Sequence, residues 1–242
     1  MPGDPPSLRP ALQISELEVR YGTVPAVRGI DLTVMAGEVI GLIGPNGAGK
    51  STTLAAIVGL VPVHRGQINH LGEQITGMLT ETVARRGVAL VPEGRHIYGG
   101  FTVEENLRLG LLARRVTEDE NISWVRELFP VVDEFSARRA GYLSGGQQQQ
   151  LAIARALVSN PSVLLLDEPS LGLAPSVVDT LFSALERVRR RGVAILIVEQ
   201  RAELTVKFAD RTHVMRDGKL VLTVDKAETA SVETLTSAYF GT

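Results

Sequence analysis

Short apolar runs alternate along this chain with segments of helical periodicity. Runs such as VIGLIG, VALV, SVLLLD and VAILIV are apolar at nearly every position, which is typical of strands buried on both faces of a parallel sheet. QISELEVRYG near the start and RTHVMRDGKLVLT near the end alternate more strictly and contain turn residues, as antiparallel edge strands do. The pattern predicts an α/β fold with a mostly parallel sheet and an antiparallel β edge.

One helix is predicted from Ser176 to Arg191. Its apolar residues recur every three or four positions and form a single stripe, made of Val177, Leu181, Leu185 and Val188. Ser176 is of a type that caps helix N-termini, and Gly192 directly follows the predicted end.

The middle of the chain has a helical pattern from Thr102 to about Ala140. It opens with TVEE, a capping box from Thr102 to Glu105, and Pro130 is expected to end a helix. We interpret residues from about 100 to 158 as a helical subdomain inserted into the core of a single domain that spans residues 12–242. Residues 1–11 are predicted to form a disordered tail.

The composition limits the class of protein. The chain has 242 residues with 44% hydrophobic content, enough for one sizeable core. Its net charge of −2 provides no basic field, so nucleic acid is not expected as a partner, and the absence of cysteine excludes disulfides and thiolate metal sites. The start lacks the apolar core of a signal peptide, and the apolar runs are too short to cross a bilayer, so we expect a soluble protein.

The segment GPNGAGKST matches the pattern G-x-x-x-x-G-K-[ST] and lies between an apolar run and a helical run. This strand–loop–helix context favours a P-loop, whose backbone N–H groups surround phosphate oxygens, over a glycine-rich turn with a surface lysine. Lys50 is expected to reach the β- and γ-phosphates of a nucleotide, and the Ser51 hydroxyl to bind Mg²⁺. The candidate nucleotide-binding residues of the loop are Gly44, Pro45, Asn46, Gly47, Ala48, Gly49, Lys50, Ser51 and Thr52.

A second candidate element is SVLLLDEPS, in which a buried strand ends in two carboxylates. Open α/β folds bind ligands at the carboxyl ends of their strands. Asp167 suits a ligand of Mg²⁺, and Glu168 suits a general base for the water that attacks the γ-phosphate. Acids that simply reach solvent at a strand end are the alternative, which the preceding P-loop makes less attractive.

The segment LSGGQQQQLAIARAL stands directly before LLLDEP. Ser144, Gly145, Gly146 and Gln147 at this helix start offer a hydroxyl, unobstructed N–H groups and a helix dipole to a phosphate. With the P-loop, this segment makes residues 12–242 resemble the nucleotide-binding subunit of ATP-binding-cassette (ABC) transporters. The resemblance implies a P-loop NTPase core and an ATPase that uses ATP and Mg²⁺.

The resemblance also implies partners. In this family the signature of one subunit completes the P-loop site of a second one, which is either a paralogous ATPase or another copy, in a head-to-tail dimer. Two membrane permease subunits and an external solute-binding protein are expected as further partners. The chain is then expected to lie peripherally at the cytoplasmic face of the cell membrane.

Further positions carry over from the resemblance. Tyr21 matches the aromatic residue that stacks on adenine, although a strand tyrosine also serves in packing. Glu93 stands where most members carry a glutamine that touches Mg²⁺, and Ala174 replaces the usual aspartate. Gln200 stands where most relatives carry a histidine that contacts the γ-phosphate; an amide can donate a hydrogen bond there or orient water, but it cannot carry a proton.

Glu199 and Arg201, the two neighbours of Gln200, are expected to be solvated or paired locally.

The segments VPEGRHIY, DEPSLGLAP and VEQ together resemble the shorter, LivF-type ATPase of branched-chain amino-acid importers. Importers of urea, short amides or aromatic acids remain alternatives, as does a nucleotide-gated module with weak turnover. A soluble ABC protein of DNA repair or translation is disfavoured, because the chain has one cassette and no long coiled-coil insert.

Permease docking is expected beside residues 92–107, with Gly99, Gly100 and Phe101 as an adaptable contact.

Overall fold

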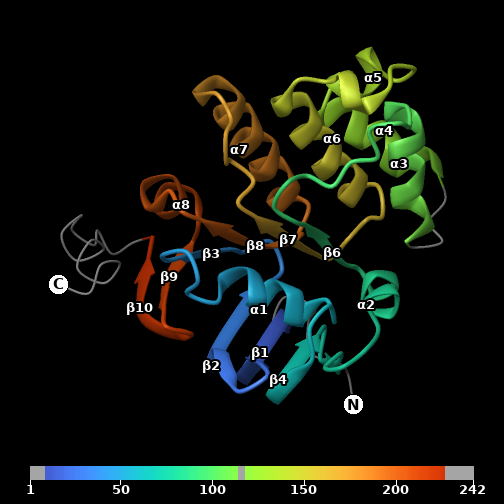
Figure 1. The fold of residues 1–242 in the computed structure, drawn as a ribbon. Coiled ribbons are helices and arrows are strands. Elements are labelled where there is room, and N and C mark those ends of the chain that lie inside the picture. Colours follow the sequence, from blue (N-terminus) through green and yellow to red (C-terminus); the bar gives the residue numbers. More distant parts are fainter. Residues whose placement is uncertain (1–8, 114–117, 227–242) are drawn as a thin grey trace.

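The computed structural model describes residues 9–113 and 118–226, with the side chains of residues 118–120 excepted. Figure 1 shows two sheets, with helices on the outer face of the larger one. Its order is β10-β9-β3-β8-β7-β6. All neighbouring strands are parallel except β9 and β10. The strands are β3 (Val39–Ile43), β6 (Val88–Val91), β7 (Val163–Asp167), β8 (Ala194–Glu199), β9 (Arg211–Arg216) and β10 (Lys219–Asp225).

The smaller sheet is antiparallel, with the order β2-β1-β4-β5. Its strands are β1 (Pro10–Tyr21), β2 (Val24–Met35), β4 (Val63–His70) and β5 (Glu73–Gln74). The expected antiparallel edge is therefore divided: β10 borders the parallel sheet, whereas the first strands form a separate sheet. β1 also corrects the expected tail at residues 10 and 11, because Ala11 is buried in this sheet. Residues 1–8 of that tail lie outside the described residues.

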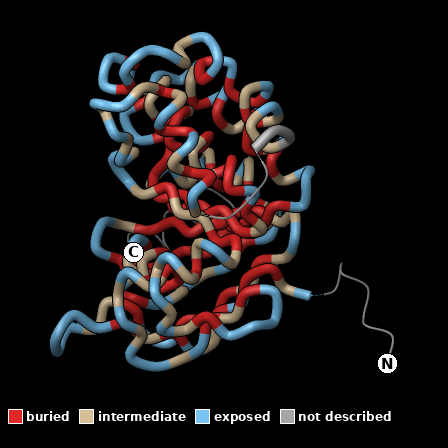
Figure 2. The backbone as a smooth tube through the Cα atoms, turned by 90° about the vertical axis from the view of Figure 1, so that its right-hand side faces the viewer, coloured by how far each residue is buried: buried red, intermediate tan, exposed pale blue. Residues whose placement is uncertain are grey.

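The parallel strands are buried on both faces, as their apolar patterns predict. Alternate residues of β7 and β8 pack into two clusters: Leu164 and Ile195 belong to one, and Leu165 and Leu196 to the other. The first cluster is covered by α6 (Gly145–Leu157), α7 (Pro175–Arg190) and α8 (Ala202–Phe208), and the second by α1 (Lys50–Ile57) and the antiparallel sheet. In Figure 2 the buried residues run through the interior of the molecule, and most exposed segments lie at the outside.

Helices dominate the segment between β6 and β7 (Figure 1). They are α3 (Val103–Leu112), α4 (Glu118–Leu128), α5 (Val131–Glu134), a 3₁₀ turn (Ala140–Tyr142) and α6, while α2 (Thr80–Arg86) precedes β6. The predicted capping box is confirmed at the start of α3, where Thr102 and Glu105 bond reciprocally. Pro130 lies between α4 and α5 and ends the first of them.

One predicted detail of α7 is wrong. The N-cap is Ala174, with Pro175 at the first helical position, and Ser176 makes no capping bond. Proline is favoured at this position because its fixed φ suits a helix start and its missing N–H has no partner there. No helix among the described residues is both long and apolar enough to cross a membrane.

Candidate nucleotide site

The loop 44–49 joins β3 to α1, as the P-loop pattern predicts. Gly44 and Gly49 have φ values of +156° and +107°. A Cβ added at Gly44 would lie 2.0 Å from the Met215 carbonyl oxygen, and one at Gly49 would lie 2.4 Å from that of Ala26. Only glycine therefore lets the loop pass this close to the neighbouring backbone.

Lys50 begins α1 and is 5% exposed. Its ammonium donates hydrogen bonds to the carbonyl oxygens of Gly44, at 2.8 Å, and Pro45, at 3.0 Å. Burial lowers the pKa of Lys50, and the nearby Glu168, Asp167 and Glu93 carboxylates oppose this effect. The loop thus holds one ammonium beside three acids. A polyphosphate that enters the loop can replace the two carbonyl oxygens as the acceptor of the Lys50 hydrogen bonds.

Ser51 connects the P-loop helix to the end of β7. Its hydroxyl donates to Asp167 Oδ1 at 3.1 Å. Burial raises the pKa of Asp167, the Glu168 and Glu93 charges raise it further, and the Ser51 bond and Lys50 lower it. A hydroxyl and carboxylates are the hard oxygen donors that Mg²⁺ prefers, so these residues fit that ion. No cluster of three or more His, Cys, Asp or Glu able to hold a metal occurs among the described residues.

Glu168 lies in a sharp turn directly after β7. It is 9% exposed and has a φ of +47°, which is uncommon for a residue with a side chain. The Gln200 amide nitrogen donates to both of its carboxylate oxygens, each at 2.7 Å. The structure thus places Gln200 on the acid expected to activate water, a partnership that the sequence did not predict.

Glu199 corrects an expectation. It is 2% exposed instead of solvated, and its Oε1 accepts a hydrogen bond from the Ser170 N–H at 2.9 Å. The reason is that β8 remains covered on both faces through its last residue. Arg201, one position beyond Gln200, is exposed as expected.

A cavity of about 290 Å³ gathers residues from several of these elements. Glu93, Glu168 and Gln200 line it together with the P-loop, although they follow three different strands, β6, β7 and β8. The sequence did not predict Ala26, which contributes to the wall from β2 and carries no chemical signal. The cavity is lined by Ala26, Asn46, Gly47, Gly49, Lys50, Ser51, Thr52, Glu93, Glu168 and Gln200.

Some expected nucleotide-binding residues do not line this cavity. Tyr21, at the end of β1, is 54% exposed and outside the cavity wall. The signature residues lie at the start of α6, where Ser144 and Gln147 form a second capping box with each other. Next to them, Arg95 packs against Gly145 and donates to Gln148 Oε1 at 3.2 Å, a contact that was not predicted from the sequence.

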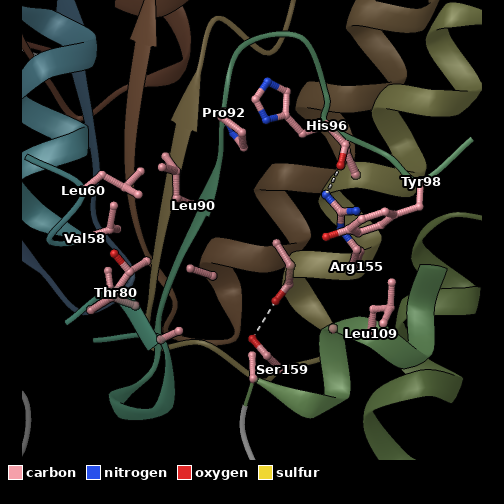
Figure 3. A pocket seen from close by; sticks show the side chains of 17 residues that line it. Val58, Leu60, Thr80, Leu90, Pro92, His96, Tyr98, Leu109, Arg155 and Ser159 are labelled. Carbon is pink, nitrogen blue, oxygen red and sulfur yellow. Dashed lines mark hydrogen bonds between the residues drawn. The ribbon is translucent and has the colours of Figure 1, made fainter. Parts of the chain in front are cut away.

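A second cavity, of about 400 Å³, lies between the α2–β6 region and helices α3 and α6 (Figure 3). Pro92, His96 and Tyr98 line it, so it is beside the expected docking segment, but Gly99, Gly100 and Phe101 do not. Phe101 instead stacks on Tyr98, with ring centroids 5.6 Å apart. We refer to this cavity as the α3–α6 groove.

Arg155 lies in the wall of the α3–α6 groove. Its guanidinium lies 5.6 Å from the Tyr98 ring centroid and donates to the His96 carbonyl oxygen at 2.8 Å (Figure 3). Its Nη1 is buried and has no hydrogen-bond partner within the described part of the chain. Burial lowers the pKa of this guanidinium, and no acidic residue lines the groove.

Comparisons with known proteins agree on one family. A family model described as ABC transporter matches residues 27–171. The high-affinity branched-chain amino acid transport ATP-binding protein BraG of Pseudomonas aeruginosa is 41% identical over 231 residues, which cover 95% of this chain and 99% of that protein. The probable branched-chain amino acid transport ATP-binding protein LivF of Archaeoglobus fulgidus is 33% identical, covering 86% and 89%.

The fold has close matches among solved structures. One is the crystal structure of the ADP conformation of an ATP-binding cassette of an ABC transporter. It matches with a TM-score of 0.81 and 26% identity, over 96% of this chain and 99% of that one.

Proposed function

Because this chain belongs to the ABC transporter family and is an ATP-binding ATPase subunit, we propose that it powers the import of branched-chain amino acids. The observation that carries the proposal is the 41% identity, over 95% of the chain, to the ATP-binding protein of a high-affinity branched-chain amino acid transporter. The direction of transport and the solute both rest on this similarity.

ATP is proposed to bind in the cavity at the P-loop. Its phosphates would lie against the backbone N–H groups of the loop and the first turn of α1, where the helix dipole favours an anion. Lys50 would turn its ammonium from the two loop carbonyls to the β- and γ-phosphates. Mg²⁺ would neutralise phosphate charge when bound, and Ser51, Asp167 and Glu93 are the residues proposed to hold it.

Glu168 is the proposed general base. Its carboxylate lies at the cavity wall, in reach of a water molecule placed against the terminal phosphate, and would accept the proton that this water loses. Both carboxylate oxygens are occupied by the Gln200 amide, so at least one of these hydrogen bonds must be released first. The freed amide N–H can then orient the water or donate to a phosphate oxygen.

A second cassette is proposed to complete the site. Ser144, Gly145 and Gly146 do not line the cavity of their own chain, which supports their use in the cavity of a partner. That partner is a paralogous ATPase or a second copy, arranged head to tail.

The α3–α6 groove is the proposed contact with the membrane permease subunits, and the chain would then lie at the cytoplasmic face of the membrane. The groove is mainly apolar and contains one desolvated cation, Arg155, without an acidic neighbour in its wall. The half-buried guanidinium donates to backbone carbonyl oxygens and has one nitrogen without a partner in the described part of the chain, so a carboxylate would gain by pairing with it. We therefore expect an apolar permease segment with a carboxylate that pairs with Arg155. An external solute-binding protein would deliver the solute to the permease.

One alternative is favoured by a specific observation. The two hydrogen bonds from Gln200 occupy the carboxylate of Glu168, as they would in a nucleotide-gated module that binds ATP and turns it over weakly. Urea, short amides or aromatic acids are alternative solutes, because the membrane and binding subunits select the solute.

The test is reconstitution of the chain with its co-purified membrane subunits and solute-binding protein in liposomes that contain ATP. We expect leucine uptake that is lost when Glu168→Gln replaces the parent chain. Uptake of urea or phenylacetate but not leucine would replace the proposed solute. A complete complex that binds ATP without hydrolysing it would support the gated module instead.

A further inference from the structure

Three consecutive residues, the last two of β8 and Gln200 directly after it, hold the turn that follows β7. The Val198 carbonyl oxygen accepts a hydrogen bond from the Glu168 N–H at 2.9 Å. The Glu199 carboxylate accepts one from the Ser170 N–H at 2.9 Å. The Gln200 side chain donates to the Glu168 carboxylate at 2.7 Å. The backbone and the side chain of Glu168 are thus fixed from the same short segment.

The turn needs such support because its first residue is strained. Glu168 has a φ of +47°, and a residue with a side chain keeps this conformation only where the surrounding structure enforces it. Inside the turn, the Leu171 N–H donates to the Glu168 carbonyl oxygen at 3.1 Å, and the Leu173 N–H donates to that of Ser170 at 3.2 Å. Ser170 lies at the centre of this arrangement, and Glu199 is the side chain that binds its N–H.

Glu199 is an unfavourable choice for stability alone. Its side chain is almost fully buried, and burial raises its pKa, while hydrogen bonds from Ser170 and the Gln200 backbone lower it and the nearby Glu168 raises it. An uncharged acceptor could bind the same N–H without the cost of a buried charge. What the Ser170 N–H requires of this side chain is therefore an acceptor oxygen and not a charge.

We propose that Glu199 is a positioning residue for hydrolysis, which holds the Ser170 N–H and thereby keeps the strained turn presenting Glu168 to the cavity. This inference rests on the proposed role of Glu168. None of the hydrogen bonds that hold Lys50 and Ser51 involves Glu199. Loss of its acceptor should therefore reduce kcat and leave the KM for ATP almost unchanged.

The test compares Glu199→Gln with Glu199→Met in the transporter complex. Gln keeps an acceptor oxygen at the same chain length, whereas Met fills a similar volume without one. We expect Glu199→Met to lower kcat at least about tenfold, because small displacements of catalytic groups have large effects on rate. Glu199→Gln should remain within about threefold of the parent. Glu203→Ala, an exposed acid on α8, serves as the control.

A second readout does not require turnover. Hydrogen exchange in the nucleotide-free chain should show a faster-exchanging Ser170 amide in Glu199→Met than in the parent, and little change in Glu199→Gln. If Glu199→Met does not fold, Glu199→Thr, whose side chain is too short to reach Ser170, takes its place. An unchanged Ser170 amide or an unchanged kcat in the acceptor-free variant would overturn the inference, as would equal damage by Gln and Met. Failure of the proposed function would appear differently, as absence of solute-stimulated turnover in the parent.

Discussion

The side-chain nitrogen of Gln200 lies 2.7 Å from both carboxylate oxygens of Glu168. An amide has two N–H donors, so one group can engage both oxygens. Glu168 is therefore oriented by the residue that must also release it to a water molecule. This geometry links the two candidate catalytic side chains more closely than a separate phosphate contact by Gln200 would.

Substitution of each member of this pair should have different effects on ATP turnover. Glu168→Gln is expected to lower turnover by about 10²–10⁴-fold, because the amide cannot accept a proton. Gln200→His should retain turnover, because an imidazole N–H can still donate to the carboxylate or a phosphate. Phosphate release by the purified chain with Mg²⁺ measures both.

Two results would contradict this assignment. Full turnover in Glu168→Gln would remove Glu168 from its role as the base. An inactive parent together with an active Gln200→His variant would mean that the native amide blocks the isolated site, and that a different partner subunit is needed to build the working one.

The sequence predicted those features of the site that depend on neighbouring residues. The P-loop, the two acids after β7 and the capping box at Thr102 each occupy a continuous segment with its own local chemistry. The ABC family, indicated by the P-loop, the acids after β7 and the LSGGQ segment, and the α/β fold, indicated by the apolar strand pattern, are both confirmed. Gln200 and Glu168 are 32 positions apart, and no local pattern tells which side chains meet across two strand ends.

Burial at strand ends was also beyond the sequence. Glutamate at a strand end is usually solvated, and only the packing on both faces of β8 shows that Glu199 is buried. The separate antiparallel sheet was missed for a similar reason. Alternating strands indicate one buried face. The alternation does not show whether such strands extend the parallel sheet at its edge or form a second sheet that packs against it.

Gly49→Ala should weaken ATP binding. Its Cβ would lie 2.4 Å from the Ala26 carbonyl oxygen and 2.7 Å from the Met215 methyl group, in a backbone with a φ of +107°. The P-loop would have to move to relieve this overlap. We expect at least a tenfold loss of affinity for a fluorescent ATP analogue, since displaced N–H groups no longer point at the phosphates.

Gly72→Ala is the matched control for Gly49→Ala. Gly72 has a φ of +82°, and a Cβ there meets nothing within 4 Å. This variant should lose about 1 kcal/mol of stability from backbone strain and bind the analogue normally. Equal affinity in the two variants would show that the close packing of the loop does not matter for binding.

Arg155→Met should leave the isolated chain folded but weaken its association with the membrane subunits. The guanidinium is half-buried, and its replacement removes the hydrogen bond to the His96 carbonyl oxygen and the contact with the Tyr98 ring, so the free chain should lose about 1–3 kcal/mol of stability. In the complex, the expected carboxylate partner would be left buried without its cation, and affinity should fall at least about tenfold. Co-purification and thermal unfolding measure the two effects.

Arg108→Met is the control for Arg155→Met, because Arg108 is an exposed α3 residue paired with Glu104. It should associate normally. If both variants bind the membrane subunits as the parent does, the α3–α6 groove does not contact an acidic permease segment.

The stability of the chain should decrease on acidification through His213. This residue is 6% exposed, and its Nδ1 lies 2.8 Å from Thr223 Oγ1. Burial, assisted by Arg211 and opposed by Asp225, lowers its pKa from 6.5 to about 4. The folded chain therefore keeps the imidazole neutral where the unfolded chain would protonate it.

The sign and range of this effect follow from the shift. Stability from His213 is fully present above pH 6.5 and is lost progressively as the pH falls from 6.5 to about 4, by an amount that approaches about 3 kcal/mol. His213→Gln can still hydrogen-bond to Thr223 but does not titrate, so its free energy of unfolding should depend less on pH across this range. The exposed His64→Gln should follow the parent. Identical slopes for His213→Gln and the parent, measured by urea unfolding at several pH values, would show that the folded chain does not keep His213 neutral.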